Sequence, residues 1–214
     1  MTPISLDTVR LPDSALCREA TEHARDLSED FLFNHVMRSY VFAAGAAPAR
    51  GLRFDPELLF LSSVLHDLGL TESAPVKTRF EVEGADMATD WARERGVDEA
   101  ELDVLWDAIA LHTVLIIPER KCAEIALCQL GAAIDVGFAP LTLVPPEVCK
   151  EALHAFPRLQ FKSRLPISMC SLIERNPDVA TTSDPVAAIA ERHETKARPR
   201  PHFCDVLHQA DFSE

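Results

Sequence analysis

One apolar stretch that ends in a histidine–aspartate pair constrains this chain most strongly. Residues 57–65 are almost all apolar or small, and His66 and Asp67 follow them directly. Asp55 can cap the start of a helix there, and Gly69 is expected to end it in a left-handed conformation. The sequence therefore predicts a core helix that carries two metal-competent side chains at its buried end.

Two further residues can complete a metal site with this pair. Successive helix residues point roughly 100° apart, so His66 and Asp67 share an ion only if it lies beside the helix end. His35 and Asp135 each follow apolar or small residues three and four positions earlier, which places them on inward helix faces. A buried carboxylate costs several kcal/mol unless something compensates its charge, and a divalent cation does so.

Together, His35, His66, Asp67 and Asp135 offer two imidazoles and two carboxylates from three predicted helices. This set suits zinc, iron or manganese and leaves positions for water, as in a catalytic site. Each residue taken alone has an ordinary explanation. A single inward histidine is more often a hydrogen-bonded core residue, and Asp135 can instead cap a helix or pair with an arginine.

Composition limits the class of protein and its partners. A chain of 214 residues with 47% apolar residues fits one folded domain. The sequence contains no run of 18 apolar residues, so we expect no membrane span. The net charge of −13 argues against nucleic acid or an anionic membrane as a partner. The start of the chain has no secretory-signal pattern, and the six cysteines form no C-x-x-C pair. We therefore expect free thiols and a cytoplasmic location.

Helical periodicity and the positions of proline and glycine predict an all-α, single-domain bundle without strands or internal repeats. The expected helices cover residues 14–27, 28–47, 57–67, 80–95, 99–113, 120–136, two within 145–175 that are separated at Pro157, and 185–194. Three parts follow from this pattern: a lead-in and helix (1–27), a metal-binding helical domain (28–175) and a C-terminal extension (176–214).

The order His…His-Asp…Asp on consecutive helices resembles the HD-domain superfamily of metal-dependent enzymes. Four longer strings, within roughly residues 30–175, resemble its cyanamide hydratase-like branch. They are Leu-His66-Asp67-Leu-Gly-Leu-Thr71, Arg79-Phe-Glu81-Val-Glu-Gly84-Ala, Trp106-Asp-Ala-Ile-Ala-Leu-His112-Thr and Phe156-Pro-Arg-Leu-Gln-Phe-Lys162. The resemblance implies an HD-type helical bundle for the metal-binding domain.

The same resemblance implies that His35, His66, Asp67 and Asp135 hold one divalent ion. That ion is zinc in the hydratase, with iron or manganese as alternatives. Several dinuclear HD enzymes carry two further histidines before the last aspartate, whereas only His112 lies in that interval here. We therefore expect one metal, with His112 facing the substrate or a metal ligand.

The chemistry implied is addition of metal-activated water to an electrophilic carbon, as in the hydration of cyanamide to urea. Asp67 would orient the water, and His112 would shuttle the proton. Arg38, Arg79 and Glu81 are the candidate substrate contacts. A solvated surface charge or an ion pair is the alternative explanation for each of these three.

Other functions stay open at the level of the sequence. The runner-up is an HD-type phosphohydrolase acting on a nucleotide or other phosphate ester, which needs several converging cations. Only Arg38, Lys77 and Arg79 are candidates for that task. A third possibility is a di-iron oxygenase, but this chain lacks one of the histidines that such an enzyme uses. A fourth is a non-catalytic binding or scaffold protein that retains the metal for stability, and the intact ligand set argues against it. We expect a small-molecule substrate as partner, and a homo-oligomer is compatible with the sequence.

Overall fold

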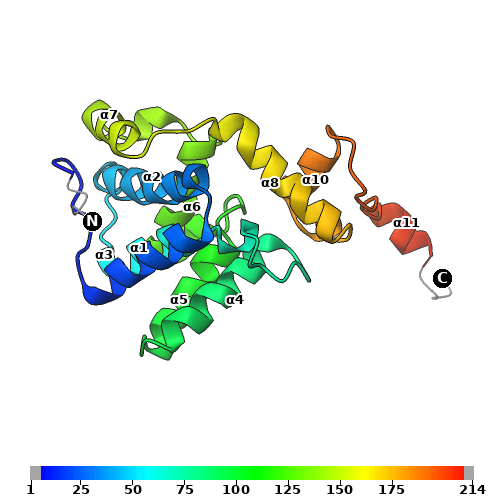
Figure 1. The fold of residues 1–214 in the computed structure, drawn as a ribbon, viewed down its shortest axis with the longest axis horizontal. Helices are drawn as coiled ribbons and strands as arrows, with labels where there is room; N and C mark the ends of the chain where they lie inside the picture. The colour runs from blue at the N-terminus through cyan, green and yellow to red at the C-terminus, as the bar shows by residue number, and fades with distance from the viewer. Residues whose placement is uncertain (1–5, 210–214) are drawn as a thin grey trace.

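The computed structural model describes residues 6–209, and the predicted all-α class is confirmed in that range (Figure 1). The bundle is built from α1 (Ala15–Leu27), α2 (Asp30–Ala46), α3 (Pro56–Leu65), α4 (Phe80–Arg93), α5 (Glu99–Ala110) and α6 (Ala123–Val136). Short 3-10 turns connect several of them. Within the described range, no helix is both long and apolar enough to cross a membrane.

Local capping explains where these helices begin. The Asp55 side chain accepts hydrogen bonds from the backbone N–H groups of Glu57 and Leu58, as the sequence predicts. Ser14 caps α1 in the same way through the N–H of Cys17. Both caps satisfy backbone donors that the first helical turn leaves without a partner.

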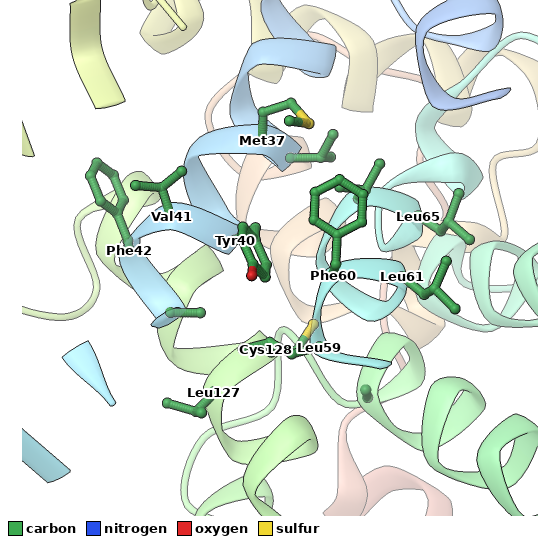
Figure 2. Packing of buried hydrophobic residues seen from close by; sticks show 14 of the residues in the cluster. Met37, Tyr40, Val41, Phe42, Leu59, Phe60, Leu61, Leu65, Leu127 and Cys128 are labelled. Atoms are coloured by element: carbon green, nitrogen blue, oxygen red, sulfur yellow. The ribbon is translucent and has the colours of Figure 1, made fainter. Parts of the chain in front are cut away.

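The bundle core lies between α2, α3, α5 and α6, and α2 packs most extensively against α6. Figure 2 shows part of this core, where the rings of Tyr40 and Phe60 meet edge to face with centroids 4.9 Å apart. Met37, Leu65 and Cys128 are buried beside them. Burial of an apolar side chain of this size stabilises the fold by about 1.5–3 kcal/mol. All six cysteines are free, as predicted.

Gly131 allows α6 to approach α2 closely. A Cβ atom at this position would lie 2.1 Å from the carbonyl oxygen of Ser39, so any larger residue would push the helices apart. Because Asp135 lies one turn after Gly131, this contact also brings the end of α6 to the middle of α2. The crossing therefore places Asp135 beside His35.

The predicted left-handed conformation of Gly69 is wrong. Gly69 lies in the 3-10 turn η2 (Leu68–Leu70) and is not among the residues with positive φ. The absence of a side chain is needed for a different reason, because a Cβ atom would lie 1.9 Å from the carbonyl oxygen of Phe80. The end of the α3 segment therefore packs directly on the start of α4.

The C-terminal part adds α7 (Pro146–Ala155), α8 (Phe161–Arg175), α9 (Val179–Thr182), α10 (Asp184–Ala190) and α11 (Phe203–His208). In Figure 1, α8 leads away from α7 toward α10 and α11. Helices α8–α10 share a second hydrophobic cluster, here called the cover cluster, with the start of α2, η2 and the start of α4. Its buried members are Phe31, Leu32, Leu70, Ala74, Val76, Phe80, Phe161, Met169, Leu172, Ile173, Val179, Ala180 and Val186.

Candidate metal centre

His66 and Asp67 lie where the regular helix α3 ends, and both are buried, with exposed fractions of 0% and 4%. The Nδ1 atom of His66 is 2.7 Å from the carbonyl oxygen of Ser63. Since that oxygen can only accept, the proton of a neutral His66 belongs on Nδ1. The Nε2 atom of His66 is therefore left with a free lone pair.

His35 enters the same site from α2. Its Nδ1 atom is 2.7 Å from Oδ2 of Asp135, so the proton again belongs on Nδ1. Its Nε2 atom faces His66 and Asp67 on the other side of the ring. The ring of Phe161, from the cover cluster, stacks on His35 with centroids 4.7 Å apart. The site thus lies between the bundle core and the cover cluster.

Three donor atoms form a nearly equilateral triangle. Nε2 of His35 is 3.3 Å from Nε2 of His66 and 3.4 Å from Oδ2 of Asp67, and the third side is 3.3 Å. Tetrahedral coordination with bonds of 2.0–2.1 Å requires donor separations of about 3.3–3.4 Å. The two facing nitrogen lone pairs repel unless a proton or a cation lies between them. The three residues therefore fit one face of a divalent-metal site.

His112 supplies a third imidazole, at the end of the α5 segment. Its Nδ1 atom is 2.6 Å from the carbonyl oxygen of Ile109, and its Nε2 atom is 3.5 Å from Oδ1 of Asp67. The side chain is buried, and its ring lies 4.6 Å from that of His66, centroid to centroid. His112 therefore presents a free Nε2 to the carboxylate oxygen that lies outside the triangle.

The pKa shifts of Asp67, His112 and His66 favour the binding of a cation at this centre. Burial alone would raise the pKa of Asp67, but interactions with His66, His35 and His112 outweigh it and lower that pKa, so Asp67 is ionised. Burial lowers the pKa of His112 to about 4, so this imidazole is neutral at pH 7. For His66, burial would lower the pKa, but Asp67 raises it. Without metal, a proton on His66 relieves the repulsion between the nitrogens.

Asp135 lies beside this centre but outside the triangle. Its carboxylate accepts from Arg38 Nε at 2.8 Å and Nη2 at 2.7 Å, from Arg158 Nη1 at 2.9 Å, and from His35 Nδ1. The imidazole ring of His35 separates it from Asp67. Burial would raise the pKa of Asp135, but the hydrogen bonds from Arg38 and His35 outweigh it and lower that pKa. The predicted metal-ligand role of Asp135 stays a prediction.

The predicted substrate contacts all have partners within the protein. Arg38 is fully buried and also donates to the carbonyl oxygen of Phe156 at 2.8 Å. Arg79 forms a bidentate pair with Glu81, at 2.9 and 3.2 Å. Glu81, also fully buried, additionally accepts from the hydroxyl groups of Thr113 and Ser183. These contacts join α4, the segment after α5 and the start of α10, and a substrate role for the three residues stays a prediction.

The segment between α7 and α8 contacts the site in a way that the sequence did not predict. Arg158 binds Asp135, and Phe161 covers His35. The segment turns sharply, since Leu159 and Gln160 have φ values of 45° and 63°. The string from Phe156 to Lys162 was a signal for this site, but its own residue pattern did not reveal the partners.

Comparison with known proteins supports the reading of the site at the level of the superfamily. The HD domain family model matches residues 32–136, a range that includes His35, the His66–Asp67 pair and Asp135. No curated protein matched the chain. HD domains bind divalent metals, and the group of His35, His66 and Asp67 is the part of the described chain that can hold one. Residues 32–136 therefore match the HD domain family, whose members are generally metal-dependent hydrolases.

Proposed function

We propose that this protein is a metal-dependent hydratase or hydrolase that adds water to an electrophilic carbon of a small, nearly neutral molecule, as cyanamide hydratase does. The triangle of His35, His66 and Asp67 carries the proposal, because three protein donors with a further position for water are typical of catalytic zinc. His35, His66 and Asp67 would hold the divalent ion, which would supply hydroxide as the nucleophile at neutral pH, and zinc is the ion we favour.

The protein's own groups would orient the reactants and move the proton. Asp67 directs Oδ2 into the triangle and Oδ1 toward Nε2 of His112. His112 is neutral at pH 7 because burial lowers its pKa to about 4. Its Nε2 is therefore unprotonated and can accept a proton during the reaction. The carbonyl oxygen of Ile109 holds the ring through Nδ1.

Hydration of a nitrile suits this arrangement. Water adds across the carbon–nitrogen triple bond of cyanamide, one C–O bond forms, the protons pass to nitrogen, and urea is the product. No leaving group departs, so a strong general acid is not needed. A base with one free nitrogen beside the reacting atoms, as His112 provides, meets the requirement.

The surroundings favour a small substrate. The four residues at the centre, which are His35, His66, Asp67 and His112, have exposed fractions of 0–6%. Phe161 stacks on His35, and Phe80 meets the ring of His112 edge to face, with centroids 5.7 Å apart. Apolar walls this close to the donors leave little room for a nucleotide.

The charges near the centre favour a neutral substrate over a phosphate ester. Arg38 and Arg158 already bind Asp135, and Arg79 binds Glu81. Phosphoryl groups are normally held by cations that are free to bind their oxygens. Among the candidates named from the sequence, only Lys77 is exposed and outside such a pair in the described chain.

Urea formation from cyanamide by the zinc-loaded protein tests the proposal, with phosphate release from a nucleotide panel measured in parallel. We expect urea without phosphate. Asp67→Ala should abolish urea formation, whereas Asp103→Ala, which removes an exposed carboxylate from α5, should not change it. Phosphate release that depends on Asp67, without hydration of cyanamide or a panel of related nitriles, would overturn the hydratase and support the phosphohydrolase.

A further inference from the structure

Asp135 contacts one side of the His35 ring, and the other two members of the triangle, His66 and Asp67, lie on the opposite side. We infer that Asp135 is a positioning residue that fixes the His35 imidazole through Nδ1 and does not itself hold the metal. This inference rests on the metal centre of the proposed function. It assigns Asp135 a role different from the ligand role that the HD-domain resemblance implies.

The two ring nitrogens of His35 face different partners. Nδ1 is 2.7 Å from Oδ2 of Asp135, whereas Nε2 is 3.3 Å from Nε2 of His66 and 3.4 Å from Oδ2 of Asp67. An oxygen that accepts from Nδ1 lies across the imidazole from any ion on Nε2. Asp135 cannot keep this hydrogen bond and also bind that ion.

Two arginines also hold the carboxylate of Asp135 in place. Oδ1 of Asp135 accepts from Arg38 Nε and Arg158 Nη1, and Oδ2 accepts from Arg38 Nη2 in addition to His35. A bidentate arginine–carboxylate pair is among the stronger charge-assisted contacts in proteins. If Asp135 moved to the metal, Arg38, whose exposed fraction is 0%, would lose its counter-charge in the interior.

Packing by Arg158 and Phe161 also keeps Asp135 on His35. Arg158 also donates to the backbone carbonyl of Asp135 at 3.1 Å. Phe161 stacks on His35, and the guanidinium groups of Arg38 and Arg158 lie 5.6 and 4.9 Å from the centre of its ring. Asp135, both arginines and Phe161 therefore form one packed group behind His35.

The three imidazoles of the centre differ in what holds them. Carbonyl oxygens of Ser63 and Ile109 accept from His66 and His112, whereas a charged carboxylate accepts from His35. A carboxylate behind a metal-binding imidazole fixes its tautomer and orientation and makes its free nitrogen a better donor. His35 is therefore the imidazole whose donor strength the protein has raised by a charged partner.

Cobalt binding without any substrate tests the assignment. We expect Asp135→Asn to bind one Co²⁺ per chain with the visible absorption bands of the wild type, because its amide oxygen can still accept from His35 Nδ1. Its affinity, measured by competition with a chelator, should be lower by roughly 10–100-fold. Asp67→Asn is the matched control that removes a donor from the triangle, and its bands should change or vanish.

Altered bands in a folded Asp135→Asn protein, matching the change in Asp67→Asn, would overturn the inference and leave the proposed function intact. Failure of the wild type to bind Co²⁺ or Zn²⁺ would overturn both. Because Asp135→Asn can also fail to fold, a crystal structure of the zinc-loaded wild type provides a second test. We expect Asp135 to remain on His35 Nδ1. A carboxylate oxygen within about 2.2 Å of the zinc would refute the positioning role.

Discussion

At the buried ends of α3 and α6, one aspartate each, Asp67 and Asp135, faces His35. The negative charges of these two aspartates are compensated by different partners. Asp67 faces the imidazoles of His66, His35 and His112, whereas Asp135 faces two guanidinium groups. Arginine carries its charge at every relevant pH, but an imidazole carries a charge only when it is protonated. The charge of Asp135 is therefore balanced by the protein itself, and that of Asp67 is fully balanced only when a proton or a metal ion arrives.

Burial of a carboxylate is thus not enough to identify a metal ligand. Both residues are 4% exposed, and both have a lowered pKa. The difference lies in the partners that lower it. This comparison yields four measurements, which follow in order of decreasing expected effect.

The largest effect is expected for metal retention. Asp67→Asn should lose bound metal and turnover completely, because it takes a charged donor out of the triangle with His35 and His66. Elemental analysis after dialysis against trace zinc measures the metal directly. Full occupancy with normal turnover in this variant would refute the assignment of the centre.

For the stability of the metal-free protein, measured with a chelator present, Asp135→Asn should have a larger effect than Asp67→Asn. Asp135→Asn should lower the free energy of unfolding by about 3–5 kcal/mol, because it leaves the buried Arg38 without a counter-charge. Asp67→Asn should cost less, since its partners can lose their protons. Urea denaturation measures both. Arg38→Met combined with Asp135→Asn should recover part of the loss, and purely additive effects would contradict the pairing.

A smaller effect is expected on acidification of the metal-free protein. Burial lowers the pKa of His112 from an ordinary value of 6.5 to about 4, so between these values the unfolded chain binds more protons than the folded one. The stability contribution is therefore complete above pH 6.5 and is lost as the pH falls toward 4. We expect a loss on the order of 1–3 kcal/mol.

Thermal or urea unfolding across pH 4–7, with a chelator present, measures this slope. His112→Asn should flatten it, because the asparagine cannot take up the proton. Asp67 and Asp135, whose pKa values are lowered, contribute a further loss at more acidic pH. An unchanged slope in His112→Asn would show that this histidine is not the group held neutral by burial.

The smallest effect is expected for Arg158→Gln. Arg158 is 33% exposed, so solvent weakens its pair with Asp135, and the buried Arg38 remains in place. We expect a loss of about 0.5–1 kcal/mol in unfolding experiments. A loss as large as that of Asp135→Asn would mean that Arg158, rather than Arg38, provides the main counter-charge.

Local chemistry in the sequence was enough to predict most helices and the burial of His35, His66 and Asp67. Ser14 and Asp55 cap their helices through atoms within three residues, so no tertiary information is needed. Helical periodicity places His35 on an inward helix face, whereas His66 and Asp67 are buried because they follow the end of an apolar core helix. The short helices α9 and α11 were not predicted, since four or six residues carry little periodic signal and helices of that length depend on their surroundings.

The sequence by itself determined the helical class, the helix starts and the presence of inward imidazoles and carboxylates on separate helices. Only the tertiary structure decided which carboxylate faces which partner. Gly131 sets how closely α6 approaches α2, and the turn after Pro157 brings Arg158 back to Asp135 over a separation of 23 residues. Helical periodicity reports which face of a helix is buried, but the charge that meets a buried carboxylate comes from another segment, so packing alone decides it.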